Sequence, residues 1–509
     1  MANRLVLKNG SVIDGTGGPA IHADIVIEEG RIAELGQIED YGDALEIDCT
    51  GLVVSPGFID VHSHSDLLVL ESRREKLLQG VTAEIVGNCG FSAFPSAADH
   101  SSLNEFAKGI FCVESGWGWA NAKDYLGAAH SSSSFSTVYS LVGHGSLRIS
   151  EVGLRHGALE ERHEVAMEES LSECLQEGAV GFSTGLMYAP GSSAESSELE
   201  RLCRVVARHN KVYATHMRSY FGDILASIAE QLELARRTGC RLQISHLLIA
   251  GRKNWHLQAQ VMEMIESAHA SGIDLAFDCY PYVAGSTVLT QALPQWCLEG
   301  GVELLLSRLQ DPATRTRIAA ETIDSLVWDW KDILISAVDS DANAQWVGRD
   351  LAFIAEATEK KPIDALLDLL ITERGAVNMI SFNQSEENLL QTLRHPLSII
   401  ISDGFYVKGR PHPRLHGTFP TFLGKFVRDQ KLMPLPEAIR KITSAPAERF
   451  GLTGRGRIAK GYHADITVFD ADKIDSDASY ENPEMPPRGL HLVMREGNVL
   501  LSAAGNGHA

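Results

Sequence analysis

Six residues whose side chains can bind transition metals or move protons each follow a largely apolar run of the sequence. His62 and His64 stand one residue apart at the end of the run in GFIDVHSHSD, and Cys89 follows the run in EIVGNCG. Alternate residues of a β-strand face the same side, so the two imidazoles are expected to point the same way. The other three residues of this kind are His216 in VYATHMRS, His246 in LQISHL and Asp403 in SIIISDG.

These residue types favour a zinc site. Imidazole and thiolate suit a borderline-soft ion, and a catalytic zinc keeps one position open for water. Five or more donors exceed the needs of one tetrahedral ion, so a second metal position is allowed, and Cys89 could bind one ion or bridge two. Asp403 is expected to belong to the metal site with these five residues, and it is the natural proton acceptor for the water that the metal activates. A lone histidine is usually structural, but six such residues at strand ends favour an active site.

The elements that would bring these residues together are the strands of a parallel α/β barrel. Extended apolar runs alternate with helical stretches through residues 54–454, which is typical of βα units. In a TIM-like (β/α)8 barrel the residues that follow the strands meet on one face. Nine runs qualify where eight are needed, so we assign one to an excursion around residues 287–345. The nine runs span residues 52–60, 83–87, 137–142, 179–183, 212–215, 242–245, 275–279, 377–382 and 398–402.

The two ends of the chain have a different pattern of apolar and polar residues from the barrel segment. Residues 1–53 alternate apolar and polar positions between turn signals such as Asn9-Gly10, and this pattern favours antiparallel hairpins. The same alternation returns in residues 455–509. We therefore expect the two ends to form one small β-sandwich, with the catalytic barrel inserted between them. Residues 287–345 would form an insertion that closes over the site as a lid.

The composition excludes several classes of partner. The 45 basic and 66 acidic residues among 509 give a formal charge of −21, which argues against nucleic acid and anionic membranes. The start of the chain lacks the apolar core of a signal peptide, and no run approaches the length of a membrane span. Eight scattered cysteines fit a reducing compartment, so a cytoplasmic location is expected. The sequence leaves a homo-oligomer open.

A series of motifs carries a resemblance to a known family. In order, they are GFIDVHSHSD, GNCGFS, LVGHGSLR, GAVGFSTGLMYAPG, ATHMRS, ISHL, YPYVAGST, ISDG, HPRLHGTFPTFLGKFVRD and KITSAPAERFGL. From residue 4 to about 471 the chain resembles the D-aminoacylases (N-acyl-D-amino-acid deacylases) of the amidohydrolase superfamily. The HxH motif alone indicates only the superfamily. The cysteine of GNCG, together with YPYVAGST, narrows the resemblance to this branch.

The resemblance implies metal ligands position by position. Cys89, His216 and His246 match the ligands of the family's tightly held zinc, whereas His62 and His64 match a second, weaker position. The resemblance thus implies Zn²⁺ as the cofactor, with one ion bound tightly and a second position allowed.

The resemblance also implies contacts with a small N-acyl substrate. Asp403 matches the catalytic aspartate, and Tyr280, Ser286 and Arg414 match residues that hold the substrate's carboxylate and reacting carbonyl. The chemistry agrees, because arginine offers a planar fork for a carboxylate and a tyrosyl hydroxyl can donate to a developing oxyanion.

Two positions depart from the family pattern. Leu248 stands where the family usually has a lysine that helps to bind the substrate carboxylate, and Tyr220 stands where an acidic residue is usual. Loss of one charged hydrogen bond costs about 1.5–3 kcal/mol. These departures predict a substrate pocket that is larger or less polar, with Leu248 in its wall.

We therefore predict a zinc-dependent hydrolase that deacylates an N-acyl-D-amino acid or a related N-acyl compound by attack of an activated water. One alternative is a specialised amidase or carbamate hydrolase of secondary metabolism or detoxification, which the two departures favour. Another is a cyclic-amide hydrolase of the hydantoin kind, against which Cys89 argues because those enzymes usually carry a bridging lysine. A barrel kept only for binding would have little reason to retain six donors.

Overall fold

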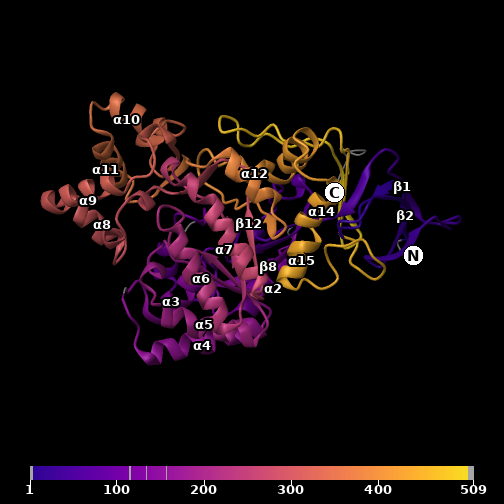
Figure 1. The fold of residues 1–509 in the computed structure, drawn as a ribbon, viewed down its shortest axis with the longest axis horizontal. Helices are drawn as coiled ribbons and strands as arrows, with labels where there is room; N and C mark the ends of the chain where they lie inside the picture. The colour runs from indigo at the N-terminus through magenta and orange to yellow at the C-terminus, as the bar shows by residue number, and fades with distance from the viewer. Residues whose placement is uncertain (1–3, 114–115, 133–134, 156, 503–509) are drawn as a thin grey trace.

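The computed structural model describes residues 4–113, 116–132, 135–155 and 157–502. It contains a central barrel, a sheet built from both ends of the chain, and a unit inserted late in the barrel. Figure 1 shows the inserted unit at one end of the molecule and the terminal strands at the other, with the barrel between them.

The barrel is a sheet of eight parallel strands in the order β16-β12-β11-β10-β9-β8-β7-β6. It closes just beyond its first and last strands, where the amide of Asp403 donates to the carbonyl of His62 (2.9 Å) and the amide of His64 donates to the carbonyl of Gly404 (2.9 Å). The predicted (β/α)8 barrel is therefore confirmed. Its strands are β6 (Phe58–Asp60), β7 (Val81–Val86), β8 (Thr137–Gly143), β9 (Gly181–Gly185), β10 (Val212–His216), β11 (Arg241–Ile244), β12 (Leu275–Cys279) and β16 (Ser398–Ile400).

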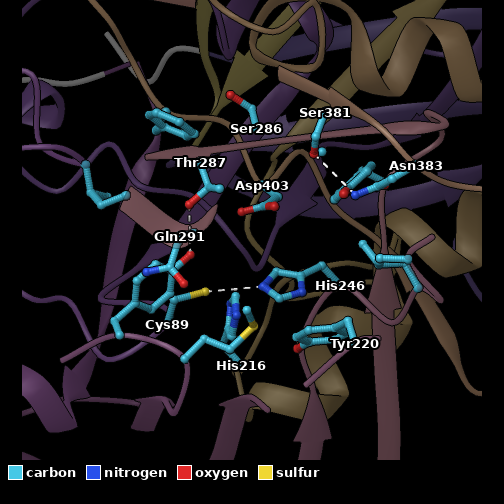
Figure 2. A pocket seen from close by; sticks show the side chains of 18 of the residues that line it. Cys89, His216, Tyr220, His246, Ser286, Thr287, Gln291, Ser381, Asn383 and Asp403 are labelled. Carbon is cyan, nitrogen blue, oxygen red and sulfur yellow. Dashed lines mark hydrogen bonds between the residues drawn. The ribbon is translucent and has the colours of Figure 1, made fainter. Parts of the chain in front are cut away.

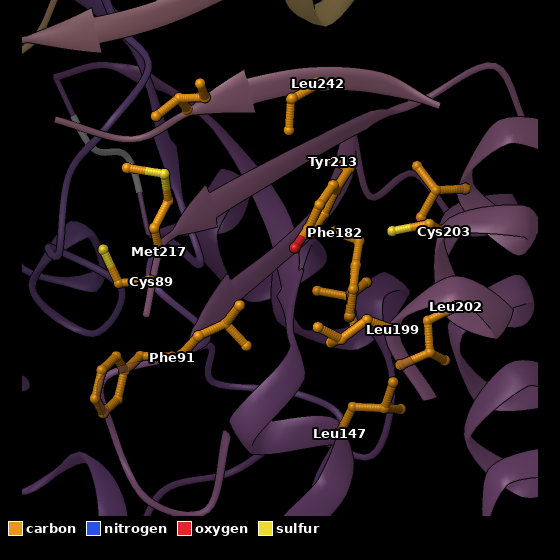
Figure 3. Close-up of a cluster of buried hydrophobic side chains, with 14 of the residues drawn as sticks. Cys89, Phe91, Leu147, Phe182, Leu199, Leu202, Cys203, Tyr213, Met217 and Leu242 are labelled. Carbon is orange, nitrogen blue, oxygen red and sulfur yellow. The ribbon is translucent and has the colours of Figure 1, made fainter. Parts of the chain in front are cut away.

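Amphipathic helices cover the outside of this barrel. In Figure 3 the apolar side chains Leu199, Leu202 and Cys203 of one helix, α5, face Phe182 and Tyr213 of the strands, and all five are buried. None of the helices in the described part of the chain is long and apolar enough to cross a membrane. The helices are α1 (Ser101–Ala107), α2 (Ala122–Ser131), α3 (His144–Val152), α4 (Glu161–Gln176), α5 (Ser196–Arg208), α6 (Ile224–Thr238), α7 (Gln258–Ala270), α12 (Glu386–Arg394), α13 (Arg414–Thr421), α14 (Leu435–Ile442) and α15 (Ser444–Phe450).

The inserted unit has its own sheet and its own core. The run 377–382, which by itself reads as a barrel strand, is strand β15 (Val377–Phe382) of a three-stranded antiparallel sheet with β13 (Ala284–Val288) and β14 (Ile333–Val338). The unit thus extends from residue 284 to 382, beyond the expected 287–345, because an apolar run does not reveal which strand it pairs with. Its helices are α8 (Val302–Gln310), α9 (Pro312–Ser325), α10 (Leu351–Ala357) and α11 (Pro362–Thr372).

The ends of the chain meet in one sheet of eight strands. Strand β17 (Ile466–Phe469) from the C-terminal end pairs antiparallel with β5 (Val53–Pro56) from the N-terminal end. Side chains from both ends share one apolar core, so the sheet folds over itself as the predicted small β-sandwich. The other strands are β1 (Leu5–Val12), β2 (Ile21–Glu28), β3 (Arg31–Gly36), β4 (Leu45–Asp48), β18 (Leu490–Arg495) and β19 (Asn498–Ser502).

Candidate metal centre

The five predicted metal ligands other than the aspartate gather at the carboxyl end of the barrel strands, in two groups that share one thiol. His62, His64 and Cys89 form one group, and Cys89, His216 and His246 form the other, with the ligand atoms of each group within 4.8 Å of one another. The Sγ atom of Cys89 lies 3.3 Å from Nε2 of His62 and 3.4 Å from Nε2 of His246. Figure 2 shows Cys89, His216 and His246 converging on one side of a cavity. Each group could hold a metal ion, and Cys89 is common to both groups.

The charge states of the second group fit a metal. Both ring nitrogens of His216 are buried without a hydrogen-bond partner in the described chain, and burial lowers the pKa of His216 to about 3. Burial and the neighbouring His216 also hold the pKa of His246 well below its usual range. Neutral imidazoles with free nitrogens are the form that binds zinc. Burial raises the pKa of the Cys89 thiol, an effect that a bound cation would reverse.

The carboxylate of Asp403 lies beside the two histidines of the first group. Its Oδ1 atom lies 3.4 Å from Nε2 of His62 and 3.3 Å from Nε2 of His64, and its Oδ2 atom lies 2.9 Å from Nη1 of Arg414. Burial opposes the negative charge, but the Arg414 guanidinium and then His62 outweigh it and hold the pKa of Asp403 well below its usual range. Asp403 is therefore an ionised carboxylate at the edge of the metal groups.

Three of the six residues have backbones in the left-handed region. Cys89 has φ 53°, His246 φ 34° and Asp403 φ 48°. Such conformations cost about 1–3 kcal/mol in a residue with a side chain and persist only where the surroundings impose them. Close backbone packing imposes the backbone conformation of Cys89. A Cβ atom on Gly185 would lie only 2.0 Å from the Cys89 carbonyl oxygen. The turns after the strands therefore aim these side chains into the cavity.

The sequence did not single out Asp278, which orients two of the histidines. Its Oδ1 atom accepts a hydrogen bond from the amide of His246 (2.6 Å) and lies 3.3 Å from Nδ1 of His62, and its Oδ2 atom accepts from Nε2 of Gln243 (2.7 Å). A carboxylate that faces the far nitrogen of a ligating histidine fixes its ring orientation and tautomer. The signal available in the sequence was a lone aspartate in the apolar strand LAFDC.

A second buried network, also missed, ties the first strand to the last. Asp60 accepts hydrogen bonds from the amide (3.0 Å) and the hydroxyl (2.5 Å) of Ser402, and Lys76 pairs with Asp60 and donates to the Ser402 hydroxyl (2.5 Å). All three side chains are buried. Because Asp60 precedes His62 by two residues and Ser402 precedes Asp403 by one, this network sets the distance between the histidine pair and the aspartate.

The predicted substrate contacts form a polar wall of the same cavity. Tyr280, Ser286 and Arg414 line it. The guanidinium of Arg414 lies over the ring of Tyr280, 4.6 Å from its centroid, and Nη2 donates to the carbonyl of Ser286 at 3.3 Å. The Nε atom of Arg414 is buried without a partner in the described chain, whereas the Ser286 hydroxyl donates to the carbonyl of Met379 (3.1 Å). Arg414 thus retains a free donor.

Another wall of the cavity is apolar. Leu248 lines it together with Ala250, Phe221 and Trp328, and the rings of the last two meet edge to face with centroids 5.5 Å apart. Trp328 comes from the inserted unit and had no distinguishing signal in the sequence. Leu248 therefore lies among mainly apolar side chains.

Tyr220 has a more specific position than the sequence indicated. Its hydroxyl donates to the carbonyl of Ser245 (2.9 Å) and accepts from the amide of Met217 (3.1 Å), so only the ring faces the cavity. The ring packs against His216 and His246, at centroid distances of 5.0 and 5.1 Å. Tyr220 thus braces the two histidine loops besides lining the pocket.

Comparison with known proteins places this architecture in a family. A model described as "Amidohydrolase family" matches residues 45–500, and the chain belongs to that family. N-acyl-D-glutamate deacylase of Alcaligenes xylosoxydans xylosoxydans is 33% identical over 506 residues, covering 99% of this chain and 95% of that protein.

Solved structures show the same similarity. N-acyl-D-glutamate deacylase from Bordetella bronchiseptica, complexed with zinc and a phosphonate inhibitor that mimics the tetrahedral intermediate, superposes with a TM-score of 0.84 at 30% identity, covering 98% of this chain and 96% of that one. A D-aminoacylase with a binuclear metal centre has a TM-score of 0.83 at 32% identity, covering 99% and 98%.

Proposed function

We propose that this protein is a zinc-dependent hydrolase that deacylates N-acyl-D-amino acids or closely related N-acyl compounds. The observation that carries the proposal is the pair of ligand groups sharing Cys89, with the ionised carboxylate of Asp403 beside them. Relatives that deacylate N-acyl-D-amino acids, at about a third identity over nearly the whole chain, support this substrate class.

In this proposal Cys89, His216 and His246 hold the tightly bound zinc, and His62 and His64 contribute to a second position. Bound zinc supplies Lewis-acid activation of the attacking water and of the scissile carbonyl. Asp278 keeps His62 and His246 oriented from behind.

Asp403 carries the protons. It accepts one from the attacking water and returns it to the leaving nitrogen, so one carboxylate acts first as general base and then as general acid. Tyr280 is available as a neutral donor to the oxyanion that develops on the scissile carbonyl, because burial raises its pKa to about 12. The free Nε donor of Arg414 is suited to a carboxylate on the amine half of the substrate.

The inserted unit of residues 284–382 acts as the lid of this site. It supplies Ser286, Thr287, Gln291 and Trp328 to the cavity wall and so covers the metal groups from the side that the barrel leaves open. A cover of this kind excludes bulk water and strengthens the electrostatic interactions inside.

A substrate screen tests the proposal. Zinc-loaded protein is assayed against N-acyl-D-amino acids and their L-enantiomers, beside neutral amides, carbamates and hydantoins. We expect hydrolysis of the D-series, with little hydrolysis of the L-series or the hydantoins. If the protein hydrolysed only neutral amides or carbamates, it would instead be a member of the alternative class, a specialised amidase or carbamate hydrolase.

A further inference from the structure

A second cavity adjoins the metal cavity. Four residues line both of them: Phe91, Ile110, Tyr188 and Gln291. The hydroxyl of Tyr188, from the barrel, hydrogen-bonds with that of Thr287, from the inserted unit, at 3.1 Å, so the two parts of the molecule meet at this junction. The two cavities therefore adjoin each other at these four residues.

The second cavity is lined mainly by apolar side chains. Hydrocarbon side chains line it from both parts of the molecule. They are Phe106, Leu154 and Pro190 from the barrel, and Val288, Leu298, Val302 and Leu305 from the inserted unit. The charged residues that line it, Glu105, Lys108 and Arg374, are exposed. The second cavity is therefore a mainly apolar channel, which we call the acyl channel. Its mouth is the side at which it opens to solvent, beside these exposed charged residues.

One buried polar atom stands at the junction. The Oε1 atom of Gln291 has no hydrogen-bond partner in the described chain, although it is buried. A buried acceptor without a donor costs about 1–3 kcal/mol, so a ligand that brings an N–H group is favoured there. In Figure 2 Gln291 lies on the Cys89 side of the metal cavity, and Asn383 lies on the opposite side. A substrate amide at the junction would meet both the metal groups and this acceptor.

We infer that the acyl channel binds the hydrocarbon chain of the acyl group, so that the preferred substrates carry a medium or long aliphatic acyl chain in place of acetyl. This inference rests on the proposed deacylase function. The acyl half is assigned to the channel because Arg414, the partner for a carboxylate on the amine half, lines only the metal cavity. Leu248 also lines only the metal cavity. The amine half of the substrate would thus bind in the metal cavity, and the acyl half would bind in the acyl channel.

The dependence on chain length follows from burial. Each methylene transferred from water to an apolar wall changes binding about fourfold. The specificity constant kcat/KM should therefore rise about fourfold per added methylene while the chain still fills the channel. Beyond the mouth, where Glu105, Lys108 and Arg374 are exposed, further methylenes remain in water and kcat/KM should level off.

The test is a series of N-acyl-D-amino acids with one fixed amine half and acyl chains from acetyl to dodecanoyl, assayed with the zinc-loaded protein. Val302→Trp narrows the channel from the inserted unit, and Leu154→Trp narrows it from the barrel. Leu304→Trp is the matched control, because Leu304 is on the same helix as Val302 but is 49% exposed and does not line the channel.

The possible outcomes distinguish the acyl channel from the deacylase function on which it rests. We expect kcat/KM to rise at least a hundredfold from acetyl to octanoyl. Either narrowing variant should reduce octanoyl hydrolysis at least tenfold with less than a twofold change for acetyl, and Leu304→Trp should match the unaltered protein. Hydrolysis of acetyl substrates with no gain from longer chains would overturn the channel but leave the deacylase standing. Failure to hydrolyse any member of the series would overturn the deacylase itself.

Discussion

The metal face of the barrel and the wall contributed by the inserted unit differ in how their side chains are held. The side chains of the metal face come from the ends of parallel strands or the turns that follow them, and the buried carboxylates of Asp278 and Asp60 brace several of these segments. The wall of the inserted unit rests on a separate apolar core and contributes mainly small or polar side chains, together with the ring of Trp328. The rigid face is suited to chemistry, whereas the separately folded wall can change its specificity without disturbing the metal.

Removing the shared thiol is the strongest way to break the metal face. Cys89→Ala deletes a ligand of both groups, so we expect loss of the tightly bound zinc and a fall in turnover to the background rate. Metal analysis of the purified variant measures the first effect. Cys279→Ala is the control, since Cys279 is equally buried but lies outside both groups. Full zinc occupancy in Cys89→Ala would refute the assignment of the site.

Asp403→Asn separates proton transfer from metal binding. The amide has nearly the same shape but cannot accept the proton, so turnover should fall by about 10²–10⁴-fold while zinc content stays nearly constant. Steady-state kinetics beside metal analysis gives both numbers. Near-normal turnover at neutral pH would mean that another group takes the proton.

Asp278→Asn tests whether the braces behind the ligands matter. The variant keeps its volume but loses the negative charge that faces His62 and receives the amide of His246, so zinc affinity should fall about 10–100-fold. Competition with a chromogenic chelator measures the affinity. Asp470→Asn, which changes a carboxylate far from the site in the terminal sheet, should leave affinity unchanged. Equal affinities in the two variants would show that the strand turns alone orient the histidines.

Leu248→Lys probes the apolar wall and should have the smallest effect. A lysine there offers a partner to an acidic substrate but places an ammonium beside Phe221 and Trp328. We expect kcat/KM to rise up to about tenfold for N-acyl-D-glutamate and to fall by a similar factor for N-acyl-D-phenylalanine. Leu225→Lys, outside the cavity, is the control. No change on either substrate would remove residue 248 from the specificity wall.

The types and order of residues along the chain were enough to predict the candidate metal ligands and the barrel that presents them. Residues that end apolar strands must meet if those strands are parallel neighbours, because all carboxyl ends lie at one edge. The sequence therefore predicts that His62, His64, Cys89, His216 and His246 lie together. The alternation of apolar and polar positions, present at both ends of the chain, likewise predicted their shared sandwich.

The residues that surround the candidate ligands are brought there by long-range packing. Strand β15 reads like a barrel strand, but its pairing with β13 and β14 is a long-range choice that a local pattern does not encode. The positions of Asp278 and Trp328 depend on the same kind of long-range packing. A lone aspartate in an apolar strand, or a tryptophan in an irregular segment, acquires its role from neighbours far away in the sequence. The shape of the substrate site was thus decided by how the inserted unit packs onto the barrel.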